Sequence, residues 1–235
     1  LPLDNKGDTE DDFYAYGISS DLISDVTSAG LIRVASLNRI EDLGDIAVIE
    51  KAKMLDVRYI AEGTLWKRDS IFQLSMEIYD TKTEKVVWSE RWQNDWKELP
   101  LIRDVLAENI LDKLKVDYTT DTPSYTVNPD AYELYLKAKH KYDKRKNTDD
   151  IEIVKGLINK AVEIDDNLIA AKILLGAIYL NTGYGNKAME ILTPILKQAT
   201  ELDDKRSIVE IYTYLGTVHT HKYDYDKALE YFNKS

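Results

Sequence analysis

The chain has 235 residues, of which 44% are hydrophobic, and a net charge of −11 at pH 7, a size and composition that suit two packed units. It contains no cysteine, which excludes disulfides, thiolate nucleophiles and cysteine-ligated zinc. Most of the acidity lies in the first part, because 15 basic and 24 acidic residues precede Tyr118. An acidic chain without a long basic run suits neither phosphate backbones nor anionic lipid, so we expect no nucleic-acid binding and no direct membrane binding.

The first elements alternate between strand-like and helix-like patterns. A short strand is expected at residues 1–4, followed by an acidic loop. Residues 13–28 predict a helix, because apolar side chains recur at four-residue spacing along one face. These apolar positions are Ile18, Leu22 and Val26. The run at 31–35 is predicted to be a second short strand.

A second helix and three consecutive strands follow. Asp45 suits the N-cap of this helix, whose expected buried stripe is Val48, Ile49, Ala52 and Leu55. Residues 71–80 alternate apolar and polar side chains, as in a strand covered on one face. The strands expected at 59–67 and 86–92 lie close enough in sequence to form antiparallel hairpins with it.

A last helix completes the first part and carries an apolar stripe. Its members are Ile102, Leu106, Ile110 and Leu114. The predicted order is therefore β-α-β-α-β-β-β-α, an α/β domain with a mixed sheet over residues 1–116.

Four stretches of this part carry a resemblance to a known family. They are LPLDN (1–5), FYAYGISSDL (13–22), VRYIAEGT (57–64) and VWSERW (87–92). These stretches resemble the TolB amino-terminal-like domains, over about half of the chain. The resemblance implies a bacterial signalling protein in which this domain stands between an effector and a tetratricopeptide (TPR) array. The effector would be a class III adenylate or guanylate cyclase, a winged-helix regulator or a kinase, and no such domain lies within these residues.

Residues 117–129 have the polar, proline-containing composition of a linker, and the sequence beyond them repeats itself. The residues that fit the tetratricopeptide pattern are Leu175, Gly176, Tyr179, Ala188 and Leu192 in one copy and Tyr212, Leu215, Gly216, Ala228 and Phe232 in the next. Glycine and alanine at these spacings let the two helices of a hairpin touch.

A third, weaker copy lies upstream. Val154, Ile158 and Ala161 precede three positions of the next copy by 34 residues each. We therefore predict three TPR-like helical hairpins over 130–235, the last one truncated, and a lengthened connection near 201–206. Stacked hairpins need neighbours that cover their end faces, so we expect a longer parent protein with further repeats, or a homo-oligomer contact, after the last hairpin.

The tetratricopeptide resemblance also implies a groove on the first helices of the hairpins, where a protein or peptide partner would bind. The groove positions are Tyr132, Tyr135, Lys139, Tyr142, Ile173, Ala177, Asn181, Thr213, Thr217 and His221. Tyrosine-rich surfaces of mixed polarity suit peptide capture. The alternative is that the tyrosines pack between hairpins or against the linker.

Other candidate chemistry has a simpler explanation. His219 and His221 lie two residues apart on a predicted helix and so point to different faces, which does not suit a metal site. The acidic residues at 4–12 do not reproduce a calcium loop. Asp21 and Glu62 are expected to be buried, with backbone groups or arginines as their partners. No nucleophile–base pattern is present, so we predict no catalytic, cofactor-binding or metal-binding residue.

The sequence thus favours a non-catalytic regulatory or scaffolding fragment of a larger signalling protein, with an adenylate or guanylate cyclase as the expected parent. The alternatives are a small-molecule sensor or an oligomerisation module of a transcriptional regulator or kinase. The sensor's ligand would lie between the sheet and its helices or at the junction with the first repeat. We expect a cytoplasmic location, with the periplasm as the alternative if the parent has a transmembrane segment.

Overall fold

The computed structural model describes residues 2–28, 32–44, 46–115 and 127–235. The chain divides into two compact units, Leu1–Thr120 and Asp121–Ser235, and each is described by itself. The first unit combines a sheet with helices, and the second contains helices only in its described part. The linker predicted at 117–129 lies largely outside the described residues.

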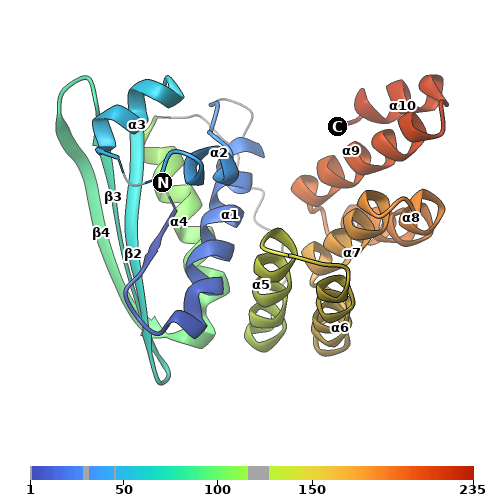
Figure 1. Ribbon diagram of the computed structural model, residues 1–235, viewed down its shortest axis with the longest axis horizontal. Coiled ribbons are helices and arrows are strands. Elements are labelled where there is room, and N and C mark those ends of the chain that lie inside the picture. The colour runs from blue at the N-terminus through green and yellow to red at the C-terminus, as the bar shows by residue number, and fades with distance from the viewer. Residues whose placement is uncertain (1, 29–31, 45, 116–126) are drawn as a thin grey trace. The chain divides into compact units, whose positions relative to one another are not determined.

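The first unit contains a four-stranded mixed sheet (Figure 1). Its elements are β1 (Asp4–Asn5), η1 (Thr9–Asp11), α1 (Asp12–Ser28), α2 (Leu37–Glu41), α3 (Val48–Leu55), β2 (Tyr59–Arg68), β3 (Ile71–Asp80), β4 (Lys85–Asp95), η2 (Trp96–Glu98) and α4 (Leu99–Lys113). The strands lie in the order β1-β2-β3-β4; β1 is parallel to β2, and the two hairpins are antiparallel. The predicted strands at 59–67, 71–80 and 86–92 are confirmed.

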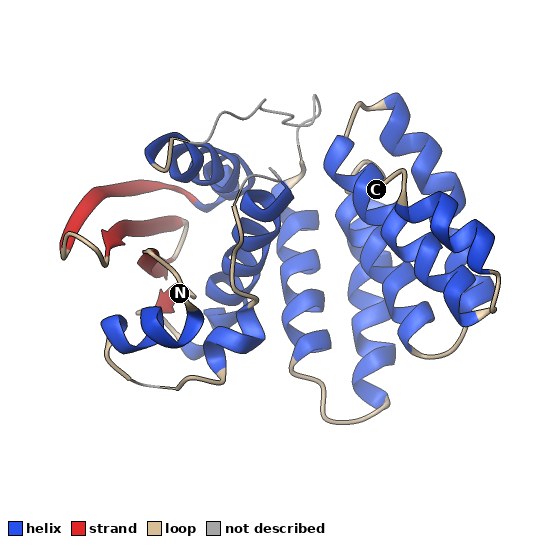
Figure 2. Cartoon of the chain, turned by 90° about the horizontal axis from the view of Figure 1, so that it is seen from above, coloured by secondary structure: helices blue, strands red, loops and turns tan. Residues whose placement is uncertain are grey.

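The core of this unit lies between one face of the sheet and the paired helices α1 and α4 (Figure 2). Every second residue of β3 is buried, from Phe72 to Asp80, because alternate side chains of a strand point to opposite faces. The predicted apolar stripes of the two helices meet this face. Their buried members are Ile18, Leu22, Val26, Ile102, Leu106 and Ile110.

Two predictions for the first unit are wrong. Residues 32–36 form no strand, and α2 follows them at once. A short apolar run does not distinguish a strand from a loop with inward side chains, and Ile32 and Val34 are half-buried in such a loop. In α3 only Ala52 of the predicted stripe is buried, and Ile49 is 39% exposed. The proposed N-cap Asp45 lies outside the described residues.

A charged contact holds the β3–β4 turn against the residues before β2. Arg58 donates to both oxygens of Asp80, with Nε–Oδ1 at 3.1 Å and Nη2–Oδ2 at 2.8 Å. The amide of Lys82 also donates to Asp80. The hydrogen bond from Arg58 lowers the pKa of Asp80 from 3.8 to about 2, although partial burial of the carboxyl acts in the opposite direction.

This contact predicts a specific acid sensitivity. Because the pKa of Asp80 is lower in the folded chain than in the unfolded one, its carboxylate stabilises the fold above about pH 4. That contribution is lost as the pH falls from about 4 to about 2. Asp80→Asn should therefore flatten the pH dependence of the unfolding free energy in this interval. Asp69→Asn, in the exposed turn between β2 and β3, should leave it unchanged, and an equal effect of both substitutions would contradict the assignment.

The second unit consists of three antiparallel helical hairpins (Figure 1). The helices are α5 (Pro129–Asp143), α6 (Asp149–Ile164), α7 (Ile169–Asn181), α8 (Gly185–Glu201), α9 (Lys205–His221) and α10 (Tyr225–Phe232). Asn128 caps α5 by accepting from the amides of Asp130 and Ala131, and Pro129 occupies the first turn, where it suits a helix best.

The helices of the second and third hairpins touch at glycine. A Cβ atom built on Gly176 would lie 2.6 Å from Cδ2 of Leu192, and one on Gly216 would lie 2.6 Å from Cε1 of Phe232. Both contacts join residues 16 positions apart, so the two hairpins repeat the same packing. The small residues predicted for these interfaces therefore have the expected role.

The predicted lengthening of the connection near 201–206 is wrong. The connection between α8 and α9 is residues 202–204, and the extra length is in the helices themselves, because α8 and α9 have 17 residues each and α7 has 13. Residues 196–201 contain no helix breaker, and Ala199 is fully buried. Burial of this side chain favours one more helical turn over a longer loop.

Two glycine substitutions should have opposite effects on stability. A Cβ on Gly156, within α6, would meet nothing within 4 Å, so Gly156→Ala should stabilise the second unit by about 1 kcal/mol through helix propensity. Gly176→Ala gains the same propensity but overpacks the buried Leu192, which costs about 1–3 kcal/mol. In urea unfolding, the unfolding free energy of Gly156→Ala should be higher than that of the unsubstituted chain, and that of Gly176→Ala should be lower. Equal shifts would contradict the close contact.

Candidate functional site

The predicted groove residues lie on the first helices of the hairpins, α5, α7 and α9, but they differ widely in exposure. Buried members are Tyr132, Tyr135, Tyr142, Ile173 and Ala177. Ile173 belongs to the hydrophobic cluster that joins α7, α8 and α9, so it supports the array from within. The half-buried or exposed members are Lys139, Asn181, Thr213, Thr217 and His221.

Two predicted residues from different hairpins are in direct contact. Nδ2 of Asn181, in the last turn of α7, donates to Oη of Tyr142 at 3.0 Å. The guanidinium of Arg145 lies 4.1 Å from the centre of the Tyr142 ring and donates to the Tyr142 carbonyl oxygen at 2.6 Å. Stacking of a cation on the ring and a hydrogen bond to its hydroxyl fix the tyrosine on both sides.

Another tyrosine, which was not predicted from the sequence, belongs to the same surface. Tyr214, on α9, packs against the hydrophobic cluster. Burial raises its pKa, and the negative charges of Glu210 and Asp143 act in the same direction, while Lys139 opposes them. The influence of these α5 groups on the Tyr214 pKa indicates that the tyrosine lies near the first hairpin. We call Lys139, Tyr142, Asn181 and Tyr214 the tyrosine face.

The two predicted groove threonines of α9 form hydrogen bonds within their own helix. The hydroxyl of Thr213 donates to the carbonyl oxygen of Val209, and that of Thr217 donates to Thr213. Such bonds satisfy the hydroxyl without a partner from another element. Thr213 is nevertheless exposed, so its methyl group remains available on the surface.

The contact between Tyr142 and Asn181 should have a small effect on stability. Tyr142→Phe removes one hydrogen bond to an exposed amide, which water can replace, so we expect a loss of about 0.5–1 kcal/mol in the unfolding free energy. Tyr225→Phe, at a side chain that is 62% exposed, is the matched control and should change it by less than about 0.5 kcal/mol. Urea unfolding with both variants measures the difference; a null result for Tyr142→Phe would mean that the bond contributes nothing.

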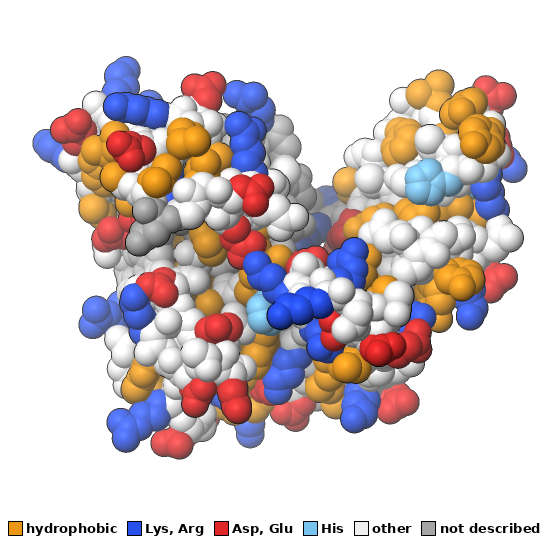
Figure 3. Space-filling model, in the orientation of Figure 1, with side chains coloured by type: hydrophobic (Ala, Val, Ile, Leu, Met, Phe, Trp, Pro, Cys, Tyr) orange, Lys and Arg blue, Asp and Glu red, His pale blue; other side chains and the backbone are white. Residues whose placement is uncertain are grey.

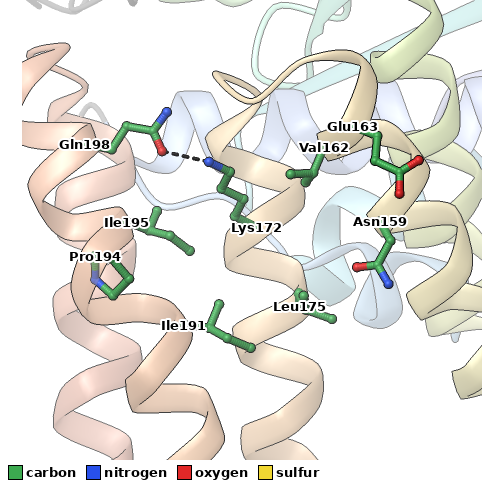
Figure 4. Close-up of a pocket in the computed structure, with 9 residues that line it drawn as sticks. All are labelled: Asn159, Val162, Glu163, Lys172, Leu175, Ile191, Pro194, Ile195 and Gln198. Carbon is green, nitrogen blue, oxygen red and sulfur yellow. Dashed lines mark hydrogen bonds between the residues drawn. The ribbon is translucent and has the colours of Figure 1, made fainter.

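A second surface is hollowed between α6, α7 and α8. One pocket there has a volume of about 470 Å³. Its lining residues, drawn in Figure 4, are Asn159, Val162, Glu163, Lys172, Leu175, Ile191, Pro194, Ile195 and Gln198. Nζ of Lys172 donates to Oε1 of Gln198 at 2.9 Å and lies 2.7 Å from Oδ1 of Asp166. This bridge ties α7 to α8 at one end of the pocket.

A neighbouring pocket of about 570 Å³ shares Asn159 and Leu175 with the first. Its centre is Tyr179, whose ring has Nζ of Lys155 at 4.9 Å and Nζ of Lys187 at 5.0 Å. Lys155 also bonds to Glu152 at 2.8 Å, which raises the lysine pKa. We call the two pockets together the α6–α8 groove.

Two local sequence features accompany this groove. Gly156 adjoins open space on α6, and Pro194 lies inside α8, where it removes an intrahelical hydrogen bond. The groove depends on which helices become neighbours, so the periodicity of α6 and α8 alone did not indicate it. A glycine within a helix was the available signal.

The histidines and Asp21, which the sequence singled out, lie in the described ranges. No group of three or more His, Asp or Glu side chains there is placed to hold a metal ion. His219 is buried, and its ring stacks on that of Tyr231 with 5.4 Å between the ring centres. Its Nδ1 lies 3.2 Å from Oδ2 of Asp224. His221 is exposed. Asp21 is buried beside Arg103 as expected, with Oδ2 3.8 Å from Nη1. Among the described helices, none combines the length and apolar character required to cross a membrane.

Comparisons with known proteins give a limited match. No family model matches the chain. It is 26% identical over 188 residues to the putative adenylate cyclase 3 of Rhizobium meliloti (strain 1021); the match covers 77% of this chain and 32% of the relative. Of the solved structures, TolB from Acinetobacter baumannii matches with a TM-score of 0.37 and 14% identity, over 48% of this chain and 27% of TolB. The PelC dodecamer from Paraburkholderia phytofirmans matches with a TM-score of 0.34 and 18% identity, over 49% of this chain and 84% of PelC.

Proposed function

We propose that this chain is a non-catalytic, protein-binding part of a larger signalling protein, related to nucleotide cyclases. The relative named as a putative adenylate cyclase supports the context, and this chain spans only about a third of it. The sequence shows no nucleophile–base pattern, and no group of three or more His, Asp or Glu side chains in the described residues is placed to hold a metal ion; a regulatory role requires neither. The observation that carries the proposal is the tyrosine face, to which all three hairpins contribute.

The tyrosine face has the chemistry of a peptide-binding surface. Asn181 and Lys139 carry donor groups, and the half-buried ring of Tyr214 adds flat apolar area at a low entropic cost. The ring of Tyr142 is buried, so this tyrosine supports the surface through its hydroxyl rather than through its ring. The bond between Tyr142 and Asn181 orders two of these groups before a partner arrives, which reduces the entropy lost on binding. We propose that an extended or helical peptide of a partner protein lies across α5, α7 and α9, as in tetratricopeptide arrays.

Selection from a displayed random-peptide library tests this function. The 235-residue chain should enrich peptides that Asn181→Arg releases, because a long cation at this position blocks the surface between α5 and α9. Asn186→Arg introduces the same side chain on the exposed surface of α8 and should retain them. Failure to enrich peptides, or equal binding by both variants, would contradict peptide binding at the tyrosine face.

The absence of catalysis is tested separately. The purified chain, incubated with ATP or GTP and either Mg²⁺ or Mn²⁺, should form no cyclic nucleotide above background. Turnover that disappears when a residue of this chain is substituted would overturn the regulatory proposal. Binding of peptides and lack of turnover are independent results, so each part of the proposal can fail alone.

A further inference from the structure

The first unit has a hollow between the sheet and the helices that cover it. It has a volume of about 770 Å³, within the range of small-molecule sites. The sheet contributes Ile60, Ala61, Met76 and Ile78, and the helices contribute Leu22, Val26, Ile40 and Ile110. All eight side chains are apolar, so the interior offers dispersion contacts and excludes charge.

The mouth of this pocket carries basic side chains. Three of the six arginines that precede Tyr118 line it, namely Arg33, Arg39 and Arg58. Arg58 is held by Asp80, whereas no described residue forms an ion pair with Arg33 or Arg39 and both are exposed. Asp56 is the acidic residue among the lining residues. Figure 3 shows hydrophobic side chains at the surface around α2 and α3, next to basic ones.

This placement of charge runs against the composition of the unit. Residues 1–117 have nine more acidic than basic side chains, so an even distribution would place acidic groups at the mouth. Unpaired arginines beside an apolar interior instead match a ligand with an anionic head and an apolar body. Arginine binds carboxylates and phosphates through two parallel hydrogen bonds, which makes it the better cation for this task.

We infer that the first unit binds a small amphipathic anion, of the chemical class of medium-chain fatty acids, with its apolar chain between sheet and helices and its head at Arg33 and Arg39. The site is independent of the tyrosine face, because all its lining residues belong to the first unit. Residues 32–35 precede α2 and join no strand, and all four line the pocket. A ligand that contacts them in the folded chain would stabilise the unit.

Decanoate is the probe for this site, below its aggregation concentration and with the full 235-residue chain. Titration calorimetry and thermal unfolding should show saturable binding and a rise in Tm. Decyltrimethylammonium and decanol, with the same chain and a cationic or neutral head, should bind at least about tenfold more weakly. Absence of decanoate binding would overturn the inference, and equal binding of all three would overturn its anionic part.

Substitutions locate the ligand. The double variant Arg33→Gln and Arg39→Gln should weaken decanoate binding by about tenfold or more, while Arg68→Gln, at the exposed end of β2, should leave it unchanged. Ala61→Phe should fill the interior and abolish binding. If this variant does not fold, Val34→Trp, in the loop at the mouth, serves the same purpose. Decanoate binding that survives a folded filling variant, or that falls equally with Arg68→Gln, would overturn the site.

Discussion

The packing of both units depends on positions where a side chain would not fit. In the first unit a Cβ on Gly63 would lie 2.5 Å from the carbonyl oxygen of Ser75 and 2.5 Å from Cδ2 of Leu3. In the second unit Gly176 and Gly216 admit Leu192 and Phe232 in the same way. Close-packed interiors transmit such constraints. The absence of a side chain at Gly63 therefore leaves room for Leu3 beside the sheet, and its absence at Gly176 and Gly216 lets the two helices of each hairpin approach closely.

The repeated helix contact has a functional consequence, because it decides which side chains of different hairpins become neighbours. The first helices bring Tyr142, Asn181 and Tyr214 together, and the α6–α8 groove opens along α7. The two surfaces differ in character. The tyrosine face combines aromatic rings with donors, whereas the groove surrounds Tyr179 with two lysines. A single array can therefore present two surfaces of distinct chemistry without any catalytic group.

The sequence was most informative where one periodicity governed a whole element. The alternation in β3 and the stripe of α1 follow directly from backbone geometry, and both were predicted correctly. The run at 31–35 was misjudged because its apolar side chains serve a loop, and Ile49 was assigned to a core that does not cover it. Tyr214 was missed because its surroundings combine the cluster of α7, α8 and α9 with charges on α5 that lie more than sixty residues away in sequence.

By itself, the sequence determined the acidic character of the first part, its hairpin strands and helix faces, and the repeated glycine and alanine positions of the second part, because these depend on local pattern and composition. Only the tertiary structure decided which predicted groove residues are buried, where Tyr142 finds Asn181, and that Arg33 and Arg39 border an apolar pocket. Such features arise from contacts between elements distant in the chain, and local periodicity carries no information about which elements become neighbours.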